Sequence, residues 1–251
     1  MKIGITEHGD AGIDLRWKDR LTDMDGAILI TKNITNAFTQ AVFDVAKNTP
    51  IILHATCTGW GGTVMEPNVP DYKTQLENTK HLIDICPDLC NVVLRVDPVF
   101  PTQKGVDRVL HMLDYFQSLK TGITSHRMSI VDEYPHVRER YRAKGFEPMY
   151  GGRFSPNDDQ IELVGKALAK TGMRFATCAE DKLTEWFPET FYIQGCVSHE
   201  DIYKMGLDYE ADMTVNPQKR NGCHCLSCKT EILNRPRQKC PHNCLYCFWK
   251  D

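Results

Sequence analysis

No stretch of this sequence is apolar for the roughly 18 residues that a membrane-spanning helix needs. The first residues also lack the apolar segment of a secretory signal peptide. No Gly-x-Gly-x-x-Gly follows the first predicted strand, which argues against a dinucleotide-binding fold. The net charge of −3 excludes an overall basic surface that advertises nucleic acid, although a local basic patch is still compatible with it. The sequence therefore predicts a cytoplasmic protein with no membrane partner.

Cysteine, in contrast, is abundant. The 251 residues include 11 cysteines, and six of them fall within residues 223–247. Disulfides are rare in a reducing compartment, where grouped cysteines more often bind metal. The odd total and the crowding therefore favour metal sites over a disulfide framework.

Short apolar segments alternate with helical patterns along the chain. Strands are predicted within residues 2–8, 26–33, 50–58, 91–98, 123–134, 173–180, 191–196 and 213–216. Helical spacing of apolar residues occurs in residues 34–45, 71–86 and 106–116, and a further helix is predicted from a Ser155 cap to Gly172. Seven or eight such units predict an α/β fold whose parallel sheet closes into a (β/α), TIM-like barrel.

The pattern changes after Asn216 to a basic, cysteine-rich segment without periodicity. We expect residues 1–216 to form the barrel. Residues 217–251 should form a cysteine-rich tail that packs on the barrel mouth, within one structural unit. The loops after the C-terminal ends of the strands build the active site in such a barrel.

The clearest motif lies in this tail. Cys240, Cys244 and Cys247 have the spacing C-x3-C-x2-C, and Tyr246 directly precedes the last cysteine. Three thiolates suit three corners of a [4Fe–4S] cluster and leave one iron open, whereas electron-transfer clusters use four cysteines. This is the pattern of radical S-adenosylmethionine (SAM) enzymes, whose open iron binds the amino and carboxylate groups of SAM. A zinc knuckle and a disulfide pair are the alternatives, but zinc sites usually present two C-x2-C pairs.

The position of this motif is unusual, because in most radical SAM enzymes the loop follows the first strand. If the last strand pairs with the first in a closed barrel, the loop lies beside the turn from Glu7 to Asp10. The chain would then be a permuted radical SAM barrel in which Glu7 or Asp10 contacts the amino group of SAM. Tyr246 could pack near the adenine.

Polar residues at the ends of other predicted strands supply further candidates. Arg95 and Asp97 alternate onto one face of an apolar strand, where burial is unfavourable unless they are paired or bind a ligand. Arg95 could hold the SAM carboxylate through two hydrogen bonds, and Lys32 is a second candidate for cofactor binding. Asp97, Asp132 and Glu180 are the candidate catalytic residues. The alternative is that strand ends are simply where the chain turns polar and reaches water.

Several short motifs, taken together and in order, resemble one known family. They are Thr31-Lys32-Asn33, Thr58-Gly59-Trp60, Glu66-Pro-Asn-Val-Pro70, Arg95-Val-Asp-Pro98, Ser129-Ile-Val-Asp-Glu-Tyr134, Thr177-Cys-Ala-Glu180, Cys196, Cys223-His-Cys225 and Cys240-Pro-His-Asn-Cys-Leu-Tyr-Cys247. The chain resembles an uncharacterised bacterial and phage family, filed as a domain of unknown function, that is described as radical-SAM-like and distantly related to spore photoproduct lyase. The resemblance implies a barrel-like fold, a C-terminal SAM-cluster loop and an unidentified substrate.

Two departures from the family pattern concern the substrate more than the cofactor. Glu7-His8 stands where the family has a pair of arginines, with Asp10 retained. The segment between Cys225 and Cys240 is longer than in the family and carries the extra Cys228.

The family pattern also includes Cys178, Cys196, Cys223 and Cys225. The sixth and seventh predicted strands should be neighbours, so Cys178 and Cys196 could meet at one rim of the barrel. With Cys223 and Cys225 folded over them, four thiolates would complete a second [4Fe–4S] cluster or a zinc site, with Cys228 as the alternative ligand. Free thiols are the third interpretation. The remaining cysteines are predicted to be structural: Cys57, Cys86 and Cys90.

The sequence therefore predicts a radical SAM enzyme. A reduced cluster would pass one electron to SAM, giving methionine and a 5′-deoxyadenosyl radical that abstracts hydrogen from the substrate. The expected partners are SAM and an electron donor such as flavodoxin or ferredoxin. The relation to a DNA-lesion lyase and the basic residues of the tail permit a nucleic-acid or nucleoside substrate, although such charges are more commonly a solvated surface. Those residues are Lys219, Arg220, Lys229, Arg235, Arg237 and Lys239.

Two rival interpretations come from other classes of protein. One is a non-enzymatic module whose zinc or iron–sulfur tail binds nucleic acid or a protein partner. The other is an iron–sulfur electron carrier, which is disfavoured because Cys240–Cys247 lacks a fourth thiol at standard spacing.

Overall fold

The computed structural model describes residues 1–208, 223–233 and 240–249. Within these ranges, eight parallel strands form one sheet in the order β7-β6-β5-β4-β3-β2-β1-β8. They are β1 (Ile3–Ile5), β2 (Gly26–Thr31), β3 (Ile51–Thr56), β4 (Asn91–Val99), β5 (Ser125–Ile130), β6 (Phe175–Thr177), β7 (Phe191–Ile193) and β8 (Lys229–Glu231). Strands that follow one another in the chain are therefore neighbours, except that β8 returns to the side of β1.

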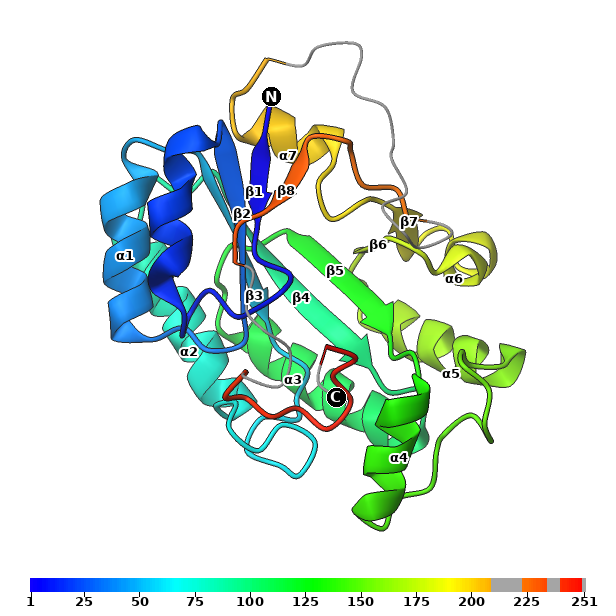
Figure 1. Ribbon diagram of the computed structural model, residues 1–251. Coiled ribbons are helices and arrows are strands. Elements are labelled where there is room, and N and C mark those ends of the chain that lie inside the picture. The colour runs from blue at the N-terminus through cyan, green and yellow to red at the C-terminus, as the bar shows by residue number, and fades with distance from the viewer. Residues whose placement is uncertain (209–222, 234–239, 250–251) are drawn as a thin grey trace.

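Helical segments connect these strands. They are the 3-10 helix η1 (Leu15–Asp23) and the α-helices α1 (Asn36–Ala46), α2 (Tyr72–Ile85), α3 (Gln103–Ser118), α4 (Pro135–Ala143), α5 (Asp158–Ala169), α6 (Asp181–Trp186) and α7 (His199–Lys204). In Figure 1 the red C-terminal segment lies near the ends toward which the arrows of β4 and β5 point. None of the described helices combines the length and the apolar character that crossing a bilayer requires.

Alternate residues of the central strands enter two different apolar cores. Leu29 and Leu53 pack with Phe38 of α1. Ile28 and Ile52, one position earlier in the same strands, belong to a separate core on the opposite face. Successive side chains of a strand point to opposite faces, so a sheet covered on both sides gives nearly continuous apolar runs. This is why these strands could be predicted from the sequence.

The two edge strands of the sheet are β7 and β8, and no strand pairing joins them within the described ranges. One backbone hydrogen bond links the segments beside them, from the N–H of Leu226 to the carbonyl of Val197 at 3.0 Å. We call this junction between the two edges the seam. An α/β fold with a single parallel sheet is thus confirmed, and its strand order is the one that a barrel requires. Closure into a barrel stays a prediction.

Strands β1 to β7 coincide with the first seven predicted strands. The eighth predicted strand, residues 213–216, lies outside the described residues. The strand beside β1 is instead β8, with Ile3 opposite Lys229. Part of the range 217–251, which the sequence assigns to a tail on the mouth, therefore belongs to the sheet.

Candidate functional site

The loop from Cys240 to Cys247, which we call the cluster loop, is fastened to the rest of the fold through its backbone. The N–H of Leu245 donates to the carbonyl of Met65 at 2.9 Å. From α4, the guanidinium of Arg140 donates to the carbonyl of Cys247 at 2.5 Å. The loop is therefore held by two segments that are far from it in the sequence.

The centre of the cluster loop is buried. Cys244 and Tyr246 belong to an apolar core with Trp60 and Phe100, and the Phe100 and Tyr246 rings meet edge to face at 5.3 Å between centroids. Cys240 and Cys247 are half-buried. Burial raises the pKa of the Cys244 thiol, while the ammonium of Lys32 acts in the opposite direction. A metal ion at this position would supply the positive charge that a buried thiolate needs.

His242 fixes the loop through both ring nitrogens. Its Nε2 lies 2.8 Å from Asp10 Oδ2, and its Nδ1 lies 3.1 Å from the carbonyl oxygen of Asn68. The carboxylate of Asp10 also accepts the hydroxyl of Thr31 at 2.6 Å and the N–H of Lys32 at 2.7 Å. Burial opposes the charge on Asp10, but these donors hold its pKa below the usual range. Asp10 thus anchors the loop, and its oxygens are already engaged by protein donors.

Glu66 lies under the cluster loop with 2% of its surface exposed. It accepts the hydroxyl of Thr58 at 2.7 Å, the ammonium of Lys32 at 3.1 Å and the phenol of Tyr246. Burial and the Glu66 carboxylate raise the pKa of Tyr246 well above its usual value, so the phenol stays protonated and donates. Lys32 also donates to the carbonyl of Asp97 at 3.0 Å. These contacts fix both the Tyr246 ring and the Lys32 ammonium beside the loop.

Arg95 and Asp97 form an ion pair within β4. Arg95 Nε lies 2.7 Å from Asp97 Oδ2, and Nη2 donates to the same oxygen. Ser129 donates to the other carboxylate oxygen at 2.5 Å. The remaining guanidinium nitrogen, Nη1, lies 3.9 Å from the sulfur of Cys196. The pairing offsets the cost of burying both charges, and it directs Arg95 toward Asp97 and Cys196.

Glu7 faces a different group from Asp10. Its carboxylate lies 2.5 Å from the ammonium of Lys229, which in turn lies 3.9 Å from the sulfur of Cys225. Burial and the nearby Cys196 raise the pKa of Glu7, while Lys229 opposes the rise. The two acidic residues after β1, which the sequence treats as alternatives for one contact, therefore serve separate sites.

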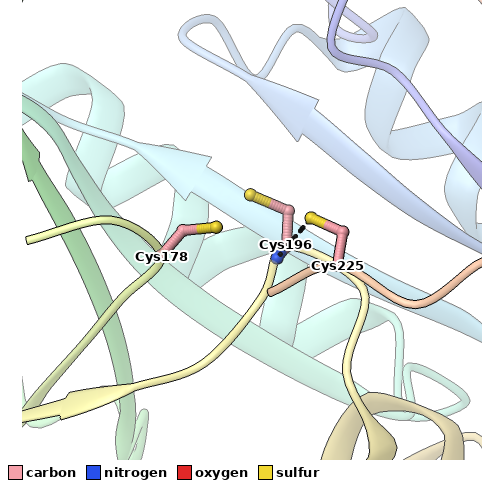
Figure 2. A group of neighbouring side chains, drawn as sticks. All are labelled: Cys178, Cys196 and Cys225. Atoms are coloured by element: carbon pink, nitrogen blue, oxygen red, sulfur yellow. Dashed lines mark hydrogen bonds between the residues drawn. The ribbon is translucent and has the colours of Figure 1, made fainter. Parts of the chain in front are cut away.

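The second cysteine group, which we call the thiol site, consists of Cys178, Cys196, Cys223 and Cys225. The ligand atoms of Cys178, Cys196 and Cys225 all lie within 4.8 Å of one another, and Figure 2 shows these side chains converging from separate segments. Cys223 Sγ lies 3.9 Å from Cys178 Sγ, and the N–H of Cys196 donates to Cys225 Sγ at 3.3 Å. Contacts with the Cys178 and Cys196 thiols lower the pKa of Cys225. Cys178, Cys196 and Cys225 are therefore close enough together to hold a metal ion or a cluster.

The other predicted site residues have different surroundings. Cys228 packs in the apolar core that contains Ile3. The Glu180 carboxylate accepts the N–H of Ile130 at 2.9 Å, which ties the start of α6 to the end of β5. Asp132 is half-buried shortly after β5. Of the basic residues predicted in the tail, the following lie outside the described residues: Lys219, Arg220, Arg235, Arg237 and Lys239.

A family model described as Domain of unknown function (DUF1848) matches residues 15–249, which is nearly the whole chain. The chain belongs to this DUF1848 family. No curated protein matches the sequence. Membership of a domain-of-unknown-function family is therefore confirmed for this DUF1848 chain, while its relation to radical SAM enzymes belongs to the proposal that follows.

His242, within the cluster loop of this DUF1848 protein, and Glu66 and Arg140, which contact the loop, are not among the predicted site residues. His242 lies inside the cysteine motif, and Glu66 begins the Glu-Pro-Asn-Val-Pro motif, so both had a sequence signal. Arg140 had none, because it sits in a charged helix, α4, whose surface arginines look alike in the sequence.

Proposed function

We propose that this protein is a radical SAM enzyme whose [4Fe–4S] cluster is held by Cys240, Cys244 and Cys247. When bound, the cluster and SAM supply a one-electron reductive cleavage that yields methionine and a 5′-deoxyadenosyl radical able to abstract hydrogen from a substrate. The observation that carries the proposal is the three-thiol loop itself, which is fastened to the fold at both ends and at its centre. A small single-electron donor, such as a flavodoxin or ferredoxin, would provide the electron.

The donor set of the cluster loop fits a cluster with three protein ligands. Three thiols come from one short loop that contains no fourth cysteine, so one iron stays open for SAM. Asn243 has a φ of 55°, in the left-handed region that asparagine tolerates better than most residues. This turn lies between Cys240 and Cys244 and lets the chain pass from a half-buried to a buried cysteine. The loop geometry therefore depends on the protein, before any ligand binds.

Charged side chains around the loop also support binding of an anionic group. The ammonium of Lys32 is buried but is matched by Glu66, at 3.1 Å, and by the carbonyl of Asp97, at 3.0 Å. Although burial opposes the charge, these partners raise the pKa of Lys32. Lys32 therefore keeps a positive charge close to Cys244 and favours its thiolate. Lys32 is the residue that we assign to orienting SAM, whereas Arg95 is engaged by Asp97 and Cys196, and the substrate itself stays unassigned.

Anaerobic purification followed by a SAM-cleavage assay tests this function. The protein should be brown, contain about four iron and four sulfide ions in the cluster loop, and release 5′-deoxyadenosine after dithionite reduction. The Cys240→Ala/Cys244→Ala/Cys247→Ala variant should release none. Cys90→Ala removes a half-buried thiol outside both cysteine groups and should behave like the wild type. A colourless wild-type protein that holds only zinc and leaves SAM intact would support the non-enzymatic module instead.

A further inference from the structure

Three sulfur atoms of the thiol site, those of Cys178, Cys196 and Cys225, have separations compatible with one tetrahedral metal ion. With a metal–sulfur bond of about 2.3 Å, tetrahedral geometry places two sulfur ligands about 3.8 Å apart. Cys178 Sγ and Cys223 Sγ are 3.9 Å apart, and the sulfurs of Cys178, Cys196 and Cys225 all lie within 4.8 Å of one another. These distances leave room for a single ion among Cys178, Cys196 and Cys225, and Cys223, beside Cys178, is the nearest candidate for the fourth ligand.

A [4Fe–4S] cluster requires larger separations between its ligand sulfurs. Each cysteine binds a separate iron at a separate corner, so the four sulfurs surround the whole cube and stand farther apart than on one ion. From the short separations, we infer that the thiol site binds a single divalent ion of the zinc class through Cys178, Cys196, Cys223 and Cys225. Each thiol that ligates loses its proton to solvent, and the oxidation state of the metal does not change. The inference uses no residue of the cluster loop and does not depend on SAM chemistry.

The charges beside the thiol site suit such an ion. Four thiolates around a divalent cation carry two net negative charges. Two cations lie next to the sulfurs: Arg95 Nη1 is 3.9 Å from Cys196 Sγ, and Lys229 Nζ is 3.9 Å from Cys225 Sγ. Groups outside the ligand shell that donate to ligand atoms orient them and tune the bound metal. Both cations are also paired with carboxylates, Arg95 with Asp97 and Lys229 with Glu7, so they can orient the ligand sulfurs but do not cancel the charge of the complex.

The position of the ligands points to a structural role at the seam. Cys178 follows β6, Cys196 follows β7, and Cys225 precedes β8. One ion would therefore connect the two edges of the sheet. Close approach of the two segments depends on Gly195, because a Cβ there would lie 2.3 Å from the carbonyl oxygen of His224. Four cysteine ligands leave no open position for substrate, as in structural zinc sites.

Metal analysis of the variant that lacks Cys240, Cys244 and Cys247 tests the inference without reference to SAM cleavage. This protein should retain about one zinc ion per chain and contain little iron. Reloaded with cobalt under anaerobic conditions, it should show the visible absorption of tetrahedral cobalt together with sulfur-to-cobalt charge transfer. About four iron and four sulfide ions per chain in this variant, or the lack of any bound metal, would overturn the inference.

Ligand variants identify the residues responsible. In the same background, Cys178→Ser/Cys196→Ser should reduce the zinc content per chain at least tenfold and should lower the melting temperature. Cys90→Ser should leave the zinc content and the melting temperature unchanged. The cobalt spectrum of the unsubstituted thiol site decides the question even if the double variant fails to fold. A double variant that binds zinc as tightly as its parent would also contradict the assignment.

Discussion

The imidazole of His242 lies 2.8 Å from the carboxylate of Asp10, which joins the cluster loop to the turn after β1. Both side chains are buried. This pair is a direct link between the cluster loop and the turn that follows the first strand of the sheet.

Replacing His242 with alanine should therefore loosen the cluster loop. The variant removes a donor from buried Asp10, so the free energy of unfolding should fall by about 1–3 kcal/mol. The iron bound per chain after desalting should fall at least twofold, because the cysteines are no longer held together. His242→Gln, which keeps an amide donor, should recover part of both losses. Wild-type iron content and stability in the alanine variant would contradict this role.

The phenol of Tyr246 should contribute to stability because its acceptor, Glu66, is buried. Tyr246→Phe keeps the ring against Phe100 but removes one donor to the carboxylate, and should cost about 1–2 kcal/mol in urea unfolding. Tyr115 provides a matched control, since its hydroxyl lies 2.5 Å from Glu77 at an exposed position. Tyr115→Phe should change stability by less than about 0.5 kcal/mol. Equal effects of the two substitutions would show that burial of Glu66 is unimportant.

Disrupting a buried ion pair beside the seam should lower the stability by a larger amount. Arg127 donates to both carboxylate oxygens of Asp201, at 2.9 and 2.7 Å, and to the carbonyl of Gly195 at 2.6 Å. Arg127→Met leaves Asp201 charged and buried, and should destabilise the protein by about 3–5 kcal/mol.

The control for this prediction is an exposed pair. Lys182 lies 2.5 Å from Asp158, but their side chains are 50% and 66% exposed. Lys182→Met should cost less than about 1 kcal/mol. Thermal and urea denaturation of the two variants should therefore separate clearly. If Arg127→Met lowers the free energy of unfolding no more than Lys182→Met does, burial of the Arg127–Asp201 pair does not increase its importance for stability.

His54 should make stability depend on pH. It is fully buried, and neither ring nitrogen has a hydrogen-bond partner among the described residues. Burial, with Arg127 and Arg95 nearby, lowers its pKa well below the usual value. Below about pH 6.5 this histidine binds a proton in the unfolded chain but not in the folded chain. The free energy of unfolding therefore falls by up to about 1.4 kcal/mol for each unit by which the pH is lowered.

Replacing His54 with leucine should remove this dependence. Between pH 6.5 and 5.5, the wild type should lose about 1 kcal/mol more than the variant in denaturant unfolding, whereas their slopes should agree between about pH 7.5 and 8.5. Parallel curves over the whole range would show that the folded protein accommodates the charged imidazole.

Much of the sheet could be predicted because burial on both faces produces a strong pattern. Runs such as Gly26–Thr31 and Ile51–Thr56 are nearly continuous in apolar residues. Strand β8 was not predicted, and neither were the helices η1, α4, α6 and α7. Helices α6 and α7 are six residues long, too short for a helical period to repeat. The first residue of α5 was also predicted wrongly, because Asn157 and Gln160 form the capping box in place of Ser155.

The candidate site was predictable where neighbouring strands bring side chains together. Cys178 and Cys196 follow adjacent parallel strands, so their meeting could be predicted from strand order alone. Arg95 and Asp97 share a face because they are two positions apart in one strand. By contrast, the divergence of Glu7 and Asp10 depends on the path of the turn after β1. The position of Glu66 depends on a long loop after β3, and neither path has a repeating sequence pattern.

Chain order has a consequence for biosynthesis. The cluster loop follows β8, so the ribosome makes it after the elements on which it docks, including the turn after β1, the loop that contains Met65, and α4. Domains are synthesised from the N-terminus at about 5–20 residues per second, which gives the earlier strands time to collapse first. The three cysteines therefore emerge onto a surface that is already assembled, and under the proposed function the cluster would be inserted late in the maturation of the protein.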